Sequence, residues 1–231
     1  QKDPCVIGIS NNDKVFPSQT VASFGSNDPQ FSEQQHQQFL HSTEAYAELF
    51  NEVSQNTQAK VVVAVIDTGI DVNHADLKNV IWTAPTGEKL INLSGSGDKD
   101  IIGHGTHVAG LIGAESGNGI GVSGTAKGIQ IMGIKVFPDD LEGGAYSTDI
   151  LNGILYATQN GADVINLSLG SPHGFNFNNY LYQEVFRNAI ANNTTIFIAS
   201  GNDSAVVSTP GTLGVMPGVI TIGSLDSADG Q

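Results

Sequence analysis

Three polar residues of this 231-residue chain stand where proton transfer could be carried out. Asp67 directly follows an apolar run at residues 61–66, His104 lies in the segment Gly-His-Gly-Thr-His-Val-Ala-Gly, and Asn202 closely follows a second apolar run at residues 195–199. A carboxylate and an imidazole can move protons, and an amide can donate a hydrogen bond to a developing negative charge. Each residue alone is more often a cap, a turn former or a solvated surface group, so only their combination is informative.

The histidines also suggest a metal site. His104 and His107 are three residues apart and therefore lie close together if this segment is helical. A zinc site needs about three protein ligands, however, and no glutamate stands on the same helical face to complete the set. We expect His107 to be a packed structural residue instead.

The elements that must position these residues alternate along the chain. The run at residues 61–66 is apolar throughout, which is typical of a strand buried on both faces of a parallel sheet. Gly161 is a stop signal for a helical pattern before it. Strands are predicted at residues 61–66, 129–137, 163–168, 195–199 and 219–223, and helices at residues 43–55, 104–114, 147–160 and 180–191. This alternation predicts a three-layer α/β fold with a mainly parallel sheet flanked by helices, in which sites form beyond the carboxyl ends of strands.

The composition excludes several classes of function. Nine basic and 23 acidic residues give a formal net charge of −14, so the surface should repel nucleic acid. The longest apolar run is far shorter than the roughly 20 residues that span a bilayer, so no membrane span is expected. The single cysteine, Cys5, has no partner for a disulfide within the chain. These features leave a loop-rich globular enzyme or binding module.

Three segments of the chain form one longer pattern. The first is Asp67-Thr68-Gly69-Ile70-Asp71, continued by His74-Ala75-Asp76-Leu77; the second runs from Gly103 to Gly110; the third is Ser200-Gly201-Asn202. Together they closely resemble the subtilisin-like serine proteases, over about residues 27 to 226. The resemblance implies a subtilisin-like fold and a catalytic order of Asp, His and Ser.

The family resemblance assigns a role to each of the three polar residues. His104 would take the proton of a serine nucleophile and return it to the leaving amine. Asp67 would fix the tautomer of His104 and stabilise its charged form, and Asn202 would donate its amide to the oxyanion. The implied activity is that of a serine endopeptidase acting on polypeptides.

The nucleophilic serine itself is missing from the pattern. Family members carry it in a Gly-Thr-Ser-Met-Ala-type segment, and residues 1–231 contain none. Ser168 and Ser200 match cleft positions of the family and are rejected as nucleophiles. We therefore expect a catalytic domain that is incomplete at its C-terminal end, inactive by itself, whose serine comes from a missing segment or a second chain. The alternative is a catalytically inactive protease-like module that binds peptides or regulates.

The resemblance also implies segments that hold the substrate. Members of this family bind a peptide as an added β-strand, so the edges of the cleft need exposed backbone and small side chains. Two segments match these edges, a third matches a wall of the specificity pocket, and Tyr146 matches its border. The matching residues are Gly143, Gly144, Ala145 and Tyr146; Ser168, Leu169 and Gly170; and Ala199, Ser200 and Gly201.

A structural calcium site is the last feature that the resemblance implies. Residues 27–31 resemble the start of the mature domain in thermitase-like members, and this resemblance implies that Asp28 is a calcium ligand. Asp76 and Asn118 match its partners, and the carbonyl groups of Ile120 and Val122 would complete the 6 to 8 oxygens that calcium needs.

The chain divides into two parts on this interpretation. Residues 1–26 are polar and irregular and would be an extension or the remnant of a propeptide, and residues 27–231 would form the N-terminal portion of the catalytic domain. No basic stretch followed by an apolar one opens the chain, so we expect a secreted or extracytoplasmic protein whose export signal has been removed.

Overall fold

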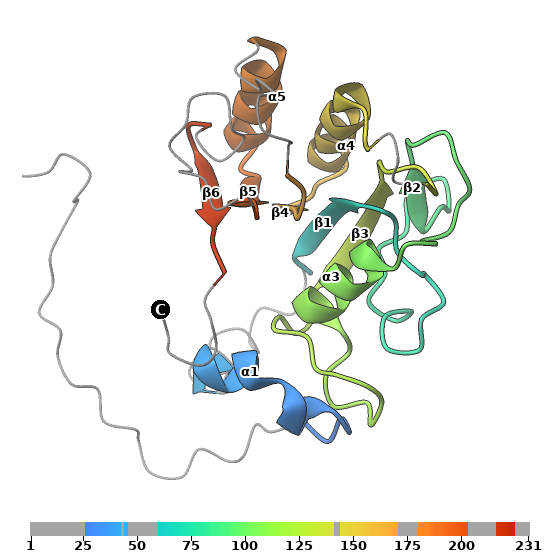
Figure 1. Ribbon diagram of the computed structural model, residues 1–231, viewed down its shortest axis with the longest axis vertical. Coiled ribbons are helices and arrows are strands. Elements are labelled where there is room, and N and C mark those ends of the chain that lie inside the picture. The colour runs from blue at the N-terminus through green and yellow to red at the C-terminus, as the bar shows by residue number, and fades with distance from the viewer. Residues whose placement is uncertain are drawn as a thin grey trace, which may run out of the picture.

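A computed structural model describes residues 26–42, 44–45, 60–140, 144–170, 180–202 and 216–224 of the chain. Its centre is a six-stranded sheet in the order β2-β3-β1-β4-β5-β6, and every neighbouring pair of strands is parallel (Figure 1). The strands are β1 (Val62–Asp67), β2 (Leu90–Asn92), β3 (Gln130–Lys135), β4 (Val164–Leu167), β5 (Thr195–Ala199) and β6 (Val219–Ile222). Because all run in one direction, their carboxyl ends meet at one edge.

Helices pack on both faces of this sheet. Helix α3 (His104–Gly113) covers one face, where Ala109 packs in a core cluster with Val63, Val65 and Ile131. Helices α4 (Ser147–Gln159) and α5 (Tyr180–Ala191) lie beside each other on the opposite face (Figure 1). The larger cluster there includes Ile66 and residues of both helices. The three-layer α/β fold is thus confirmed, and the mainly parallel sheet is parallel at every described pairing.

Both faces of β1 are buried because it lies in the middle of the sheet. All six of its residues are buried, which confirms the strand predicted from an uninterrupted apolar run. Its residues alternate between the two clusters: Val62, Ala64 and Ile66 face α4, and Val63 and Val65 face α3. The other predicted strands and the helices at residues 104–114, 147–160 and 180–191 are confirmed within two residues at each end, with Gly161 in the left-handed region after α4.

Three short elements were not predicted. They are β2, the 3₁₀ helix η1 (Phe31–Glu33) and helix α1 (Gln35–Phe39). Helix α1 lacks an apolar stripe because glutamines fix this segment: the side-chain amides of Gln34 and Gln37 both donate to the carbonyl oxygen of Ser123, at 2.9 and 3.0 Å. The helix predicted at residues 43–55 falls almost entirely outside the described residues.

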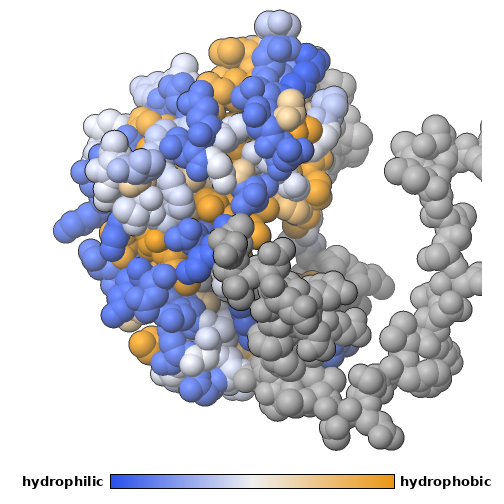
Figure 2. Space-filling model, turned by 180° about the vertical axis from the view of Figure 1, so that it is seen from behind, coloured by the Kyte–Doolittle hydropathy of each residue, from blue (hydrophilic) through white to orange (hydrophobic). Residues whose placement is uncertain are grey.

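The surface of the molecule is polar over much of one face. The face shown in Figure 2 is largely hydrophilic, with apolar side chains in separate patches. Among the described residues, no helix combines the length and the apolar character needed to cross a bilayer.

Candidate active site

The end of β1 and the start of α3 bring Asp67 and His104 together. Asp67 is the last residue of its strand and His104 the first of its helix. The Nδ1 atom of His104 lies 2.7 Å from Oδ1 of Asp67, a hydrogen-bond distance. The Asp67 side chain is 1% exposed and that of His104 is 50% exposed. A buried carboxylate thus orients an imidazole whose other side faces outward.

The glycines of the two motifs allow this approach. A Cβ atom on Gly105 would lie 2.1 Å from the carbonyl oxygen of Gly69 and 3.1 Å from Cβ of Asp67. No side chain fits there, so Gly105 lets the first turn of α3 lie directly against the segment that follows β1. Gly69 itself has a φ of +114°, which an L-residue with a side chain rarely adopts. The spacing of the motifs therefore reflects close backbone packing.

The carboxylate of Asp67 is held in an unfavourable environment. Burial raises the pKa of Asp67, and the hydrogen bonds from His104 and from the N–H of Thr68 offset only part of this. Its second oxygen, Oδ2, is buried and has no hydrogen-bond partner among the described residues. A charge kept partly desolvated in this way interacts strongly with any positive charge that develops on the imidazole.

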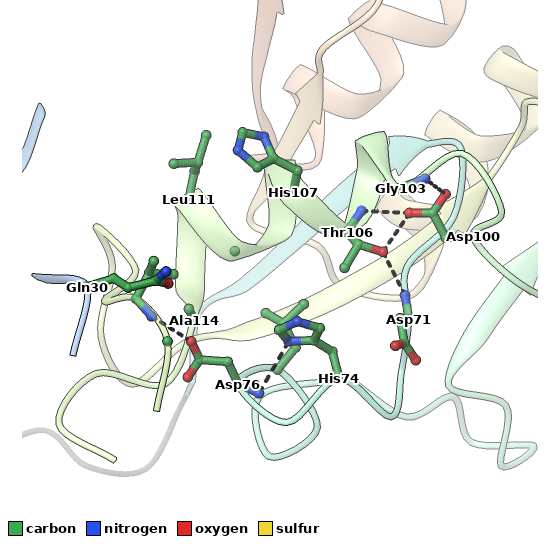
Figure 3. A pocket seen from close by; sticks show the side chains of 14 residues that line it. Gln30, Asp71, His74, Asp76, Asp100, Gly103, Thr106, His107, Leu111 and Ala114 are labelled. Carbon is green, nitrogen blue, oxygen red and sulfur yellow. Dashed lines mark hydrogen bonds between the residues drawn. The ribbon is translucent and has the colours of Figure 1, made fainter. Parts of the chain in front are cut away.

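A second carboxylate, Asp100, contacts both the first turn of α3 and the segment after β1. Its two oxygens accept hydrogen bonds from the N–H of Gly103, from the N–H and hydroxyl of Thr106, and from the hydroxyl of Thr68. Figure 3 shows the bonds to Gly103 and Thr106, and the bond from the N–H of Asp71 to the Thr106 hydroxyl. No motif marks Asp100 as a functional residue; its position four residues before His104 is the only signal in the sequence.

An open cavity of about 500 Å³ lies along α3. His74 and His107 are among the residues that line it (Figure 3). The prediction that His107 is packed is wrong, because this residue is exposed. The buried residues of α3 are Gly105, Ala109 and Gly113, and a residue midway between the first two points to the opposite side of the helix.

A buried lysine, Lys135, hydrogen-bonds to the segment that follows Asp67. Lys135, the last residue of β3, is fully buried, and its Nζ atom donates to the carbonyl oxygen of Thr68 at 2.7 Å. It also lies 3.3 Å from the Asp139 carboxylate, which is 40% exposed. In the sequence, Lys135 is marked by being a charged residue within an otherwise apolar run.

The segments predicted to bind substrate follow other strands at the same edge. Ser168, Leu169 and Gly170 follow β4; the Ser168 hydroxyl accepts from Asn166 at 2.9 Å, and the Leu169 side chain is buried in the core. Tyr146 precedes α4 and is 75% exposed. Gly144 and Ala145 stand before it, and Gly143 is outside the described residues.

The third predicted segment ends β5. The N–H of Ser200 donates to Ile222 of β6 at 2.8 Å, which continues the sheet by one residue. Ala199, at the end of the strand, is exposed. Gly201 has a φ of +93° and turns the chain, so that Asn202 is exposed beyond the edge of the sheet. Asn202 therefore lies at the same edge as Asp67.

The residues predicted to bind calcium gather around one loop after α3, which carries Asn118, Ile120 and Val122. Asp76 is buried, and its two oxygens accept from the Asn118 amide at 2.8 Å and the N–H of Val122 at 2.9 Å. The Asn118 oxygen accepts from the N–H of Ile120. Gly121 has to be a glycine here, because a Cβ atom would lie 2.5 Å from Oδ2 of Asp76.

Asp28 approaches the same loop from the N-terminal segment. It accepts from the N–H groups of Gly117 and Gly119 and from the hydroxyl groups of Ser26 and Ser123. Burial alone would raise the pKa of Asp28, but these hydrogen bonds outweigh it and hold the pKa below its usual value. These hydrogen bonds join the N-terminal segment to the loop after α3. Among the described residues, no three carboxylate, imidazole or thiol groups converge at one point, so any cation here would also need amide and main-chain oxygens.

The arrangement at Asp67 and His104 is suited to general base catalysis. The carboxylate places the proton of a neutral imidazole on Nδ1, which leaves Nε2 free to accept another. Among the described residues, no hydroxyl or thiol group hydrogen-bonds to this Nε2 atom. The pair could therefore serve a nucleophile or a water molecule that approaches from outside this part of the chain.

Comparison with known proteins agrees with this geometry. The model of the Subtilase family matches residues 58–231. Subtilisin DY of Bacillus licheniformis is 40% identical over 171 residues, which cover 73% of this chain and 58% of that protein. Thermitase of Thermoactinomyces vulgaris is 32% identical over 180 residues, or 76% of this chain and 57% of that protein. The chain thus spans somewhat over half the length of these relatives.

Solved structures show the same fold. A protease from Pseudoalteromonas arctica superposes with a TM-score of 0.60 at 28% identity and covers 85% of this chain and 65% of its own. The epidermin leader peptide processing serine protease from Staphylococcus aureus gives a TM-score of 0.58 at 23% identity, over 76% of this chain and 49% of its own. At that identity, the second match bears on the fold alone.

Proposed function

Because this chain belongs to the subtilase family, we propose that it supplies the Asp–His pair of a serine endopeptidase that hydrolyses peptide bonds in proteins. The observation that carries the proposal is the 2.7 Å contact between His104 and Asp67 at the carboxyl edge of the sheet. His104 acts as the general base through Nε2 and then as the acid toward the leaving amine. Asp67 holds its tautomer and stabilises the imidazolium.

The remaining roles are assigned to residues of the same sheet edge. Asn202 donates its side-chain amide to the oxyanion of the tetrahedral intermediate. The peptide substrate binds as an added strand between the segments 144–146 and 168–170. Support for this comes from their position after β4 and before α4 and from the exposure of Tyr146 and Gly170. Residues 199–201 form a further wall of the specificity pocket.

We place the nucleophilic serine outside residues 1–231, on a further segment or a second chain. Two observations support this placement. The sequence lacks a Gly-Thr-Ser-type segment, and the chain matches only 58% of Subtilisin DY. Residues 1–231 alone should therefore hydrolyse no peptide bonds.

A fluorophosphonate probe, which forms a covalent bond to an activated serine, tests the proposal on the protein as isolated. We expect labelling of a serine outside residues 1–231, located by mass spectrometry of the digested protein. His104→Ala should abolish the labelling. His107→Ala, an exposed residue of the same helix, is the matched control and should leave it intact. Saturable binding of extended peptides by a preparation that contains every co-purifying chain, without labelling, would favour the inactive peptide-binding module instead.

A structural calcium ion is the second part of the proposal. The donor types fit, since two buried carboxylates, Asp28 and Asp76, and the Asn118 amide meet one loop, and calcium prefers such oxygens. Asp28, Asp76 and Asn118, with main-chain oxygens of Ile120 and Val122, would hold the ion. Its role would be to neutralise the carboxylates and to fasten residues 26–39 to the loop.

A further inference from the structure

The helix that carries His104 is capped by residues from outside it. The first N–H groups of a helix have no partners within the helix. The N-cap of α3 is Gly103, which has no side chain to accept from them. The N–H of Gly105 donates instead to the Thr68 hydroxyl at 2.9 Å, and the N–H of Thr106 donates to Asp100 at 2.9 Å. The cap of α3 is thus built from two other segments of the chain.

Asp100 connects these segments into one unit. One of its oxygens accepts from the Thr68 hydroxyl and from the N–H of Gly103, both at 2.9 Å. The other accepts from the N–H of Thr106 and, at 2.6 Å, from its hydroxyl. Thr68 is the neighbour of Asp67 in the chain, and His104 lies between Gly103 and Thr106. Every bond of Asp100 therefore ends beside one member of the Asp67–His104 pair.

The charge of Asp100 favours this arrangement. A carboxylate at the amino end of a helix interacts favourably with the helix dipole. Burial would raise the pKa of Asp100, but the hydrogen bonds from Thr106, Gly103 and Thr68 prevail and lower it. The residue is thus ionised across the neutral range and accepts all four bonds as a carboxylate.

We propose that Asp100 is a positioning residue: by bridging Thr68 and the first turn of α3, it sets the 2.7 Å approach of His104 to Asp67. It does not reach the reacting atoms and acts through the placement of the imidazole. The geometric part of this inference concerns the folded chain alone. Its consequence for peptide hydrolysis rests on the proposed function.

Proton NMR of the protein as isolated tests the geometric part without any need for activity. The proton on Nδ1 of His104 should give a far-downfield signal that exchanges slowly with water. Asp100→Asn and Thr106→Val each remove part of the bridge and should speed this exchange by about tenfold or more, or broaden the signal away. Thr106→Ser keeps both bonds and should retain the signal. Asp98→Asn is the matched control, since Asp98 is exposed and its side chain accepts, within the described part of the chain, from Asn92 alone.

Kinetics on the active protease test the consequence. Asp100→Asn should lower kcat by about 10- to 100-fold, since displacement of a catalytic group by about 1 Å has effects of this size. KM should change little, because the bridge touches none of the proposed substrate segments. If kcat falls while the His104 signal stays intact in both Asp100→Asn and Thr106→Val, the proposal that Asp100 positions the imidazole of His104 is wrong. An unchanged signal in both variants, with near-ultraviolet circular dichroism like that of the parent, overturns the inference even if the protein proves to have no protease activity.

Discussion

Asp67 offers one oxygen to His104 at 2.7 Å, while its other oxygen is buried without a partner among the described residues. The fold therefore keeps a carboxylate in a place that stabilises the imidazolium but disfavours the carboxylate itself. Such a group contributes to function at the expense of folding stability.

The first prediction concerns the pH dependence of stability. Burial raises the pKa of Asp67 in the fold. Such a carboxyl group contributes fully to folding stability below its unfolded pKa of about 3.9. This contribution to stability is lost as the pH rises through the higher pKa of the folded state. In Asp67→Asn the side chain is uncharged at every pH, so the variant does not lose folding stability in this way. Calorimetry from about pH 4 to about pH 8 should show the melting temperature of the variant rising relative to that of the parent. The exposed Asp71→Asn is the control, and a difference at Asp67 that stays constant with pH contradicts the argument.

The second prediction concerns the contact between α3 and the segment after β1. Gly105→Ala places a methyl group 2.1 Å from a backbone oxygen, so helix and strand end must move apart. We expect a loss of about 1–3 kcal/mol or more in the free energy of unfolding, measured by denaturant titration. Gly110→Ala is the matched control. Its methyl group would meet nothing within 4 Å, so it should stabilise the helix by roughly 0.5–1 kcal/mol. Equal effects of the two substitutions would show that the close approach is unimportant.

A feature of the fold could be predicted from the sequence where neighbouring residues carry a pattern for it. The strand β1 was predictable because burial on both faces leaves an uninterrupted apolar run, and the pair Asp67 and His104 because its two motifs resemble those of a known family. The bridging role of Asp100 was not predictable from its neighbours: its bonds to Gly103 and Thr106 are local, but the bond to Thr68 that completes the bridge joins residues 32 positions apart.

The same limit explains two other differences. Helix α1 depends on glutamines that bind Ser123, 86 and 89 residues away, so no local apolar period marks it. The exposure of His107 was equally hard to predict, because two of the three buried residues of α3 are glycines, which give no hydrophobic signal for the side that faces the sheet.

The third prediction concerns acid release of the N-terminal segment. The pKa of Asp28 is lowered in the fold, so its contribution to stability is present above the unfolded value of about 3.9 and is lost as the pH falls through the lower folded value. Hydrogen exchange measured at decreasing pH should therefore show residues 26–39 opening before the sheet. Asp28→Asn should make the segment open at neutral pH and remove the pH dependence. If the segment opens only together with the sheet, Asp28 does not control it.

The last prediction separates calcium from the hydrogen bonds at Asp28 and Asp76. An ion that binds only the folded state adds about 2.7 kcal/mol at 100 times its dissociation constant. A chelator should therefore lower the melting temperature and speed proteolysis near Asn27. Asp76→Ala also removes the bonds to Asn118 and Val122, so a lower melting temperature of this variant is expected with or without the ion. The decisive result is that the variant loses its sensitivity to the chelator, whereas the exposed Asp98→Asn keeps it. The calcium site is wrong if the melting temperature of the parent is unchanged in excess chelator and elemental analysis finds no calcium in the untreated protein. The two carboxylates would then be stabilised by their N–H and hydroxyl partners alone.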